Sequence, residues 1–165
     1  MAANVRFHNP NTLAPQSGYS YVVDTTSPGR TVYIAGQLGL DMENKLVGAP
    51  GDFRAQCIKA IENLKAALAS VGAQLSDVVK ITNYLTDMSS HIGVYREVRD
   101  QFFSMPRPAS TAVGISQLAR PGALFEIEAI AVLPAKAAKA AGARGASRSA
   151  KAKAKSKSAG RRKRK

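Results

Sequence analysis

One run of apolar residues constrains the fold more than any other feature of this chain. Between residues 53 and 71, apolar side chains recur at steps of 4, 4, 3, 4 and 3 positions. This spacing places side chains on one face of an α-helix. The run comprises Phe53, Cys57, Ile61, Leu64, Leu68 and Val71. Asp52 before the run is a typical helix cap and Gly72 after it is a typical stop, so the pattern predicts an amphipathic helix that covers a core.

Strand-like segments, rich in β-branched and aromatic residues, lie on both sides of this helix. They cover residues 19–24, 31–38, 77–86, 110–118 and 124–133, with a weaker segment at 5–7. We expect the segments at 19–24 and 31–38 to pair as a hairpin. A second helix is predicted from a cap at Ser89 or Ser90 to Phe103, because the prolines that follow cannot continue it. The order β-β-α-β-α-β-β predicts an α+β domain with two helices on one face of a mixed sheet.

The last strand indicates which face of the sheet the helices cover, because its residues alternate between two faces. The apolar set is Phe125, Ile127, Ala129, Ala131 and Leu133. The other set is Leu124, Glu126, Glu128, Ile130 and Val132. The first set suits packing under the helices, whereas the second mixes two carboxylates with apolar residues. A half-apolar outer face favours a partner, so we expect an oligomer.

Positive charge is concentrated at the C-terminal end of the chain. Of the 24 Lys and Arg residues, 13 lie in residues 135–165, which contain no Asp or Glu. The other 11 basic residues balance the 11 acidic residues of 1–134. We therefore predict a neutral domain over 1–134 and a basic tail over 135–165. The tail contains no large apolar residue, so we expect it to be disordered on its own.

The density of charge in the tail favours a polyanionic partner. Lys and Arg on a disordered chain contact phosphates and release counterions, which favours nucleic acid without sequence preference. The candidate nucleic-acid contacts are Lys151, Lys153, Lys155, Lys157, Arg161, Arg162, Lys163, Arg164 and Lys165. The alternative is a solvated tail that only keeps the protein soluble.

Other classes of protein are disfavoured by composition. Cys57 is the single cysteine, so an intramolecular disulfide is excluded, and no His, Cys and Asp cluster has the spacing of metal ligands. No run approaches the ~18 apolar residues of a membrane span, and the N-terminus lacks the apolar region of a secretory signal. We expect a cytoplasmic protein, with the nucleoid as a second location if the tail binds DNA, and no membrane partner.

Four sequence blocks, in this order and spacing, resemble the reactive-intermediate deaminase family, also called Rid or YjgF. The blocks are VYIAGQ at 32–37, IENLKA at 61–66, DVVKITNYLTDM at 77–88 and EIEAIA at 126–131. The resemblance spans residues 5–134 and implies a chorismate-mutase-like fold in a homotrimer, whose three sheets close into a barrel. It also implies a small-molecule pocket in each intersubunit cleft. Members of the family hydrolyse 2-imino acids to 2-oxo acids and ammonia without a metal or other cofactor.

Transferred residue by residue, the resemblance gives Glu126 the catalytic role, because it matches the glutamate that positions the attacking water. Tyr19 matches a tyrosine that lines the cleft. Gly36 matches the family's strand glycine, and a glycine within a strand also indicates a bulge or a close backbone approach. The family's helix asparagine falls on Arg96. The remaining candidate substrate contacts are Ser110 and Thr111, in the block that carries the family's arginine.

The family's arginine, which binds the substrate carboxylate, falls on Ser110. A neutral hydroxyl does not replace a guanidinium fork. We therefore predict a Rid-family trimer that binds a small carboxylate-bearing or imine metabolite, with weak or altered 2-imino acid deaminase activity. In a first alternative, Arg96 supplies the anion contact to an active deaminase or related hydrolase. Arg107 is a poorer candidate, since its odd offset places it on the opposite face of an extended strand. The second alternative is a non-enzymatic, nucleic-acid-associated protein.

Overall fold

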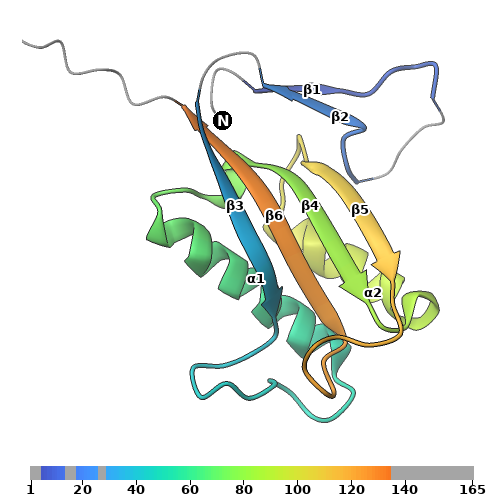
Figure 1. The fold of residues 1–165 in the computed structure, drawn as a ribbon. Helices are drawn as coiled ribbons and strands as arrows, with labels where there is room; N and C mark the ends of the chain where they lie inside the picture. The colour runs from blue at the N-terminus through green and yellow to red at the C-terminus, as the bar shows by residue number, and fades with distance from the viewer. Residues whose placement is uncertain (1–4, 14–17, 26–28, 135–165) are drawn as a thin grey trace, which may run out of the picture. The chain divides into compact units, whose positions relative to one another are not determined.

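Two β-sheets and two α-helices make up residues 5–13, 18–25 and 29–134, which are the residues that this computed structural model describes (Figure 1). The elements in chain order are β1 (Val5–His8), β2 (Val22–Thr25), β3 (Gly29–Leu38), α1 (Phe53–Ser70), the short 3₁₀ helix η1 (Leu75–Asp77), β4 (Val78–Leu85), α2 (Met88–Phe102), β5 (Ala109–Gly114) and β6 (Phe125–Pro134).

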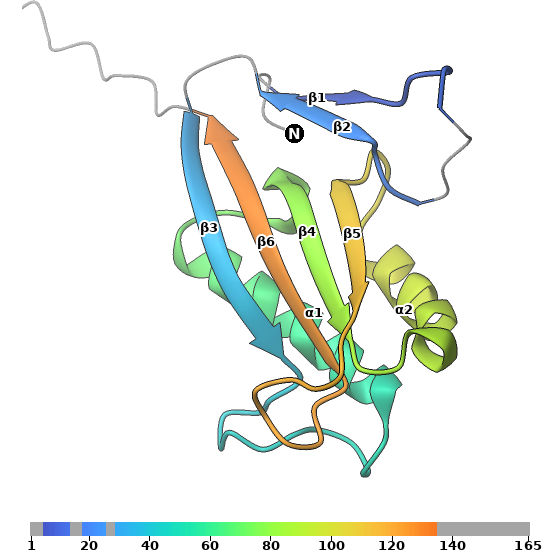
Figure 2. The ribbon, with the colours of Figure 1, turned by 45° about the vertical axis from the view of Figure 1, so that its right-hand side comes forward.

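The main sheet is mixed and has the strand order β3-β6-β4-β5. β6 runs antiparallel to both of its neighbours, whereas β4 and β5 are parallel. Figures 1 and 2 show α1 and α2 on the same face of this sheet. The α+β fold expected from the sequence, with two helices on one face of a mixed sheet, is confirmed.

Helix α1 begins and ends where its sequence predicts. The Asp52 side chain accepts a hydrogen bond from the Ala55 backbone N–H, which satisfies one of the free donors of the first turn. Gly72 follows the helix with a φ of 75°, a conformation that favours glycine. The predicted apolar face is buried from Phe53 to Leu68, and only Val71, at the C-cap, is exposed.

The core lies between the helices and one face of the main sheet. On β6, the four residues from Phe125 to Ala131 that were predicted to face the helices are at most 3% exposed. Glu126, Glu128 and Ile130 point to the opposite face and are half-buried. We call this second face, formed by β3, β6, β4 and β5, the open face, because no described helix covers it.

The predicted hairpin between residues 19–24 and 31–38 is wrong. β2 pairs instead with β1, in a separate two-stranded sheet, and β3 pairs along its length with β6. The physical reason lies in β6, whose alternate residues are almost completely apolar. Such a strand is best buried between two neighbours, and β3 supplies the second neighbour beside β4.

The predicted cap of the second helix is also wrong. The N-cap of α2 is Asp87, whose side chain accepts a hydrogen bond from the Ser90 backbone N–H. Asp and Ser are comparable caps, so the sequence alone did not distinguish them. Hydrogen bonds from Ser90 and Ser89 lower the pKa of the Asp87 carboxyl to about 2, which keeps it charged at the positive end of the helix.

No helix among the described residues is long and apolar enough to cross a membrane.

Candidate functional site

The candidate catalytic residue, Glu126, lies on the open face beside Gly36. The β3–β6 register shifts between Ile34 and Gln37, so Gly36 sits at an irregularity of the ladder, as its sequence context indicates. A Cβ atom on Gly36 would overlap the Glu126 carboxylate. Glycine therefore leaves the space that the carboxylate occupies, and this close approach holds it at the end of β3.

The open face carries further charge around this carboxylate. Desolvation raises the pKa of Glu126, and the neighbouring Glu128 carboxylate raises it further. Lys80 donates hydrogen bonds to the Ile81 carbonyl at 2.6 Å and to the Thr82 hydroxyl at 3.1 Å. Desolvation lowers the pKa of Lys80, against the opposing effect of Glu128. Both shifts move the pKa toward neutral pH, which is the direction that suits general acid–base catalysis.

A hollow of about 420 Å³ lies on the same face. It is lined by Tyr33, Ile34, Ala35, Lys80, Thr82, Glu128, Ala129 and Ile130. Tyr33 is 77% exposed. Thr111 belongs to this face as well, because it lies in register with Thr82 of β4.

Ser110, where the family's arginine was expected, faces the helices and not the open face. It pairs with the buried Ile81, and its hydroxyl accepts a hydrogen bond of 3.2 Å from the Asn83 side chain. Burial raises the pKa of the nearby Tyr95 phenol to about 12, whereas Ser110 and Arg99 lower it. The Tyr95 hydroxyl and the Asn83 side-chain oxygen are buried, and neither has a hydrogen-bond partner among the described residues. Ser110 therefore borders a buried polar region.

Arg96, the predicted anion contact, lies on the exposed side of α2, and no described contact joins it to Ser110. Arg99 is the arginine on the buried side, and its guanidinium lies 5.7 Å from the centre of the Tyr95 ring. Arg99 is not among the residues predicted from the sequence. Its position four residues after Tyr95 could have revealed it, because residues at that spacing share a helix face.

Arg99 and Arg107 both bind Asp100, and we call these three residues the arginine cluster. Oxygen Oδ1 of Asp100 lies 2.8 Å from Nη2 of Arg99 and 3.1 Å from Nη2 of Arg107. Arg107 was expected on a strand, on the face opposite Ser110. β5 begins only at Ala109, so Arg107 lies in the preceding loop, where strand alternation does not apply.

The segment that carries Tyr19 lies against the arginine cluster. Gly18 has a φ of 84°, and a Cβ atom there would overlap the Arg99 guanidinium and lie 3.2 Å from Nη1 of Arg107. Ser20 fixes the segment, since its backbone N–H donates to the Pro108 carbonyl and its hydroxyl donates to the Arg107 carbonyl at 2.7 Å. Tyr19, Ser110 and the arginine cluster thus share one edge of the fold.

One chain does not bring all of the predicted site residues together. Gly36, Thr111 and Glu126 lie on the open face, whereas Tyr19 and Ser110 lie at the edge of β5. Glu126 is in register with Tyr84 and, through it, with Val113 of β5. Ser110 is three residues back along β5, two strands from β6 and on the opposite face, about 14 Å away by the spacing of residues and strands. A small molecule bound to one chain would not contact both groups.

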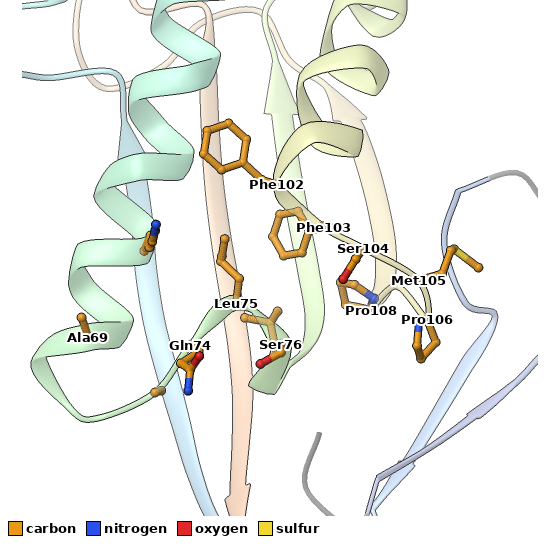
Figure 3. Close-up of a pocket in the computed structure, with 13 residues that line it drawn as sticks. Ala69, Gln74, Leu75, Ser76, Phe102, Phe103, Ser104, Met105, Pro106 and Pro108 are labelled. Carbon is orange, nitrogen blue, oxygen red and sulfur yellow. The ribbon is translucent and has the colours of Figure 1, made fainter.

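Another hollow, of about 420 Å³, lies between η1 and the C-terminal ends of α1 and α2 (Figure 3). Leu75, Phe102 and Phe103 give it apolar walls, and Lys65 is its single charged lining residue. None of the predicted site residues lines it, and it holds no carboxylate or imidazole for proton transfer.

The described residues contain no group of three or more His, Cys, Asp or Glu side chains that could hold a metal ion. Burial raises the pKa of the Cys57 thiol to about 12, so it is protonated and packs as a small apolar residue. The basic tail residues predicted to contact nucleic acid lie outside the described residues.

Comparison with known proteins matches residues 10–133 to the family model described as Endoribonuclease L-PSP. A RutC family protein of Pyrococcus abyssi is 40% identical over 103 residues, which are 62% of this chain and 79% of that protein. A 2-iminobutanoate/2-iminopropanoate deaminase of Dermatophagoides farinae is 36% identical over 124 residues, 73% of this chain and 91% of that protein. The structure of a Rid-family protein of Yersinia pestis has a TM-score of 0.72 and 35% identity, covering 79% of this chain and 99% of that one.

Proposed function

Because this chain belongs to the Rid/YjgF family, whose family model is described as Endoribonuclease L-PSP, we propose that it hydrolyses 2-imino carboxylates in clefts between copies of itself. The products are a 2-oxo acid and ammonia. A relative named 2-iminobutanoate/2-iminopropanoate deaminase, 36% identical, supports this class of substrate.

The observation that carries the proposal is the environment of Glu126. A carboxylate whose pKa is raised by desolvation is a stronger base than a solvated one. In the proposed reaction, Glu126 accepts a proton from water as the water oxygen bonds to the imine carbon. The protonated carboxyl then returns this proton to the nitrogen, which gives a carbinolamine. The same carboxylate next moves the hydroxyl proton to the amino group, the carbon–nitrogen bond breaks, and ammonia leaves as the carbonyl forms.

The proposed site lies between subunits. Glu126 on the open face is too far, within one chain, from Tyr19, Ser110 and the arginine cluster at the edge of β5. A second copy whose β5 edge lay against the open face would bring the Tyr19 segment to Glu126. The exposed Tyr33 and the apolar surface around Ile130 would be covered in such an assembly. We propose a homotrimer. Sedimentation or light scattering at micromolar concentration should report three copies, and a monomer would contradict this.

The proposed activity is weak or altered relative to relatives that carry the arginine. The Ser110 hydroxyl is neutral, is bonded to Asn83 and faces the helices, so it offers no charge to a substrate carboxylate. Losing a charged hydrogen bond typically costs about 1.5–3 kcal/mol, or roughly 10- to 100-fold in binding.

The test compares two isosteric variants on neighbouring positions of β6. 2-Iminobutanoate is generated in situ from an amino acid, and the formation of 2-oxobutanoate is measured against the uncatalysed rate. Glu126→Gln should lower kcat by about 10²-fold or more, the usual contribution of a general base. Glu128→Gln should keep most of the activity and move the acid limb of the pH profile downward, since the Glu128 charge raises the pKa of Glu126. Full activity in Glu126→Gln would contradict the proposal.

A second function is favoured by the charge distribution. The 13 basic and no acidic residues of 135–165 support nucleic-acid binding by the tail, without sequence preference. If a tail neutralises about 6–10 phosphates, affinity should fall about 10³- to 10⁵-fold between 50 and 200 mM salt. Gel shifts on two unrelated duplexes would compare the natural chain with a full-length variant whose tail Lys and Arg are all replaced by Gln. Equal binding by the two proteins would refute this function.

A further inference from the structure

We propose that the arginine cluster supplies the carboxylate-binding site that Ser110 does not, with Arg107 as the residue that contacts the substrate. This inference rests on the proposed hydrolysis of 2-imino carboxylates. It assigns the anion contact to Arg107, in the loop before β5, with Arg99 of α2 beside it. Neither Ser110 on β5 nor Arg96 on α2 has this role.

The charge of the arginine cluster favours an anionic ligand. Two guanidiniums share one carboxylate, so the arginine cluster carries an excess of one positive charge. The side chains of Arg99 and Arg107 are only 7% and 16% exposed, whereas that of Asp100 is 45% exposed. A largely buried cation without a counter-ion is costly, and an anionic ligand would remove that cost.

The hydrogen-bond donors of the two arginines are not all used by described residues. Arg99 directs Nε and Nη2 at Oδ1 of Asp100, at 2.9 and 2.8 Å. Arg107 donates from Nε to the Phe103 carbonyl at 3.0 Å and places Nη2 3.1 Å from Asp100. Nη1 of Arg107 makes no hydrogen bond to any described residue. The two N–H groups of Nη1 can donate to a carboxylate, and the positive charge of the guanidinium strengthens these hydrogen bonds.

The backbone that carries Tyr19 lies against the arginine cluster. A Cβ atom on Gly18 would overlap the Arg99 guanidinium and lie 3.2 Å from Nη1 of Arg107, so the backbone at Gly18 packs against both guanidiniums. The Gly18–Ser20 segment is held by two hydrogen bonds to the loop that carries Arg107. A segment in this position excludes water, and charge interactions are stronger where water is excluded. Tyr19, the candidate cleft residue, belongs to the same segment.

The alternative contact, Arg96, is on the same helix but on its exposed side. Replacing Arg96 therefore distinguishes the two assignments, because it removes one positive charge from α2 without changing the arginine cluster.

The experiment titrates the full-length protein by calorimetry with two probes, 2-oxobutanoate and its uncharged amide. Arg107→Gln should weaken 2-oxobutanoate binding about 10- to 100-fold and leave amide binding unchanged. Arg107→Lys, which keeps the charge but loses the planar fork, should bind with intermediate affinity and serves if Arg107→Gln does not fold. Arg96→Gln should bind both probes as the natural protein does. In the hydrolysis assay, Arg107→Lys should raise KM more than it lowers kcat.

If Arg107→Gln folds and binds 2-oxobutanoate as tightly as the natural protein, the arginine cluster is only structural and the inference is overturned. The loss of hydrolysis in Glu126→Gln would still support the proposed function. If Arg96→Gln shows the loss instead, the inference is also overturned. If the natural protein binds neither probe and does not hydrolyse 2-iminobutanoate, the proposed function itself is refuted.

Discussion

Asp100 is the one carboxylate of the arginine cluster, so Asp100→Asn tests whether it neutralises two arginines. The change removes its charge from contacts of 2.8 and 3.1 Å and leaves two guanidiniums without a counter-ion. Breaking a buried ion pair costs about 3–5 kcal/mol, and breaking an exposed pair costs about 0–1 kcal/mol. Asp100 is half-exposed and its partners are buried, so we expect a loss of about 2 kcal/mol. For a domain of this size, this lowers Tm by roughly 8 °C.

The assay is equilibrium unfolding in urea, together with thermal melting, on the full-length protein. Glu97→Gln is the matched control, because Glu97 on the same helix pairs with Arg54 at an exposed site. It should change stability by no more than about 0.5 kcal/mol. Adding Arg107→Gln to Asp100→Asn removes one of the unpaired cations, so the double variant should be at least as stable as Asp100→Asn alone. Equal stability of Asp100→Asn and Glu97→Gln, or additive losses in the double variant, would refute this reasoning.

Three further predictions concern the open face and helix α2. Gly36→Ala should displace the Glu126 carboxylate and lower kcat/KM about 10²-fold with little change in Tm, since a flexible side chain can move aside; unchanged kinetics would contradict this. Glu126→Gln should be more stable than the natural protein at about pH 7 and equally stable at about pH 3. The raised pKa of Glu126 means that the folded state loses stability as pH rises through that pKa, and urea unfolding at both pH values would show it. Gly93→Ala, where a Cβ meets nothing within 4 Å, should stabilise α2 by about 0.5–1 kcal/mol, and a lower Tm would contradict this.

Local patterns predicted the elements that depend on neighbouring residues. Helix α1 follows from its apolar spacing and its cap at Asp52. From Phe125 to Ala131, the buried and open faces of β6 follow from strict alternation, which ends at Val132, where the side chain is buried as well. In both cases the periodicity of the backbone determines which side chains share a face, and a single chain segment contains all of the information.

Pairing and charge networks depended on residues far apart in the sequence. Nothing near β2 indicates that it pairs with β1 and not with β3, because the competing partner β6 lies about a hundred residues later. The arginine cluster joins a helix to a loop and is covered by Gly18, more than 80 residues earlier. Strand alternation does not apply to Arg107, since β5 begins two residues after it, and the face predicted for its side chain was therefore wrong.

The central claim is that each active site combines Glu126 of one subunit with the arginine cluster of another. The most direct test coexpresses Glu126→Gln and Arg107→Gln chains and measures the hydrolysis of 2-iminobutanoate by the mixed assembly. With random mixing, about one quarter of the clefts would contain both natural residues, so activity should return to about one quarter of that of the natural protein. Activity no greater than that of the two variants assayed separately would contradict the account.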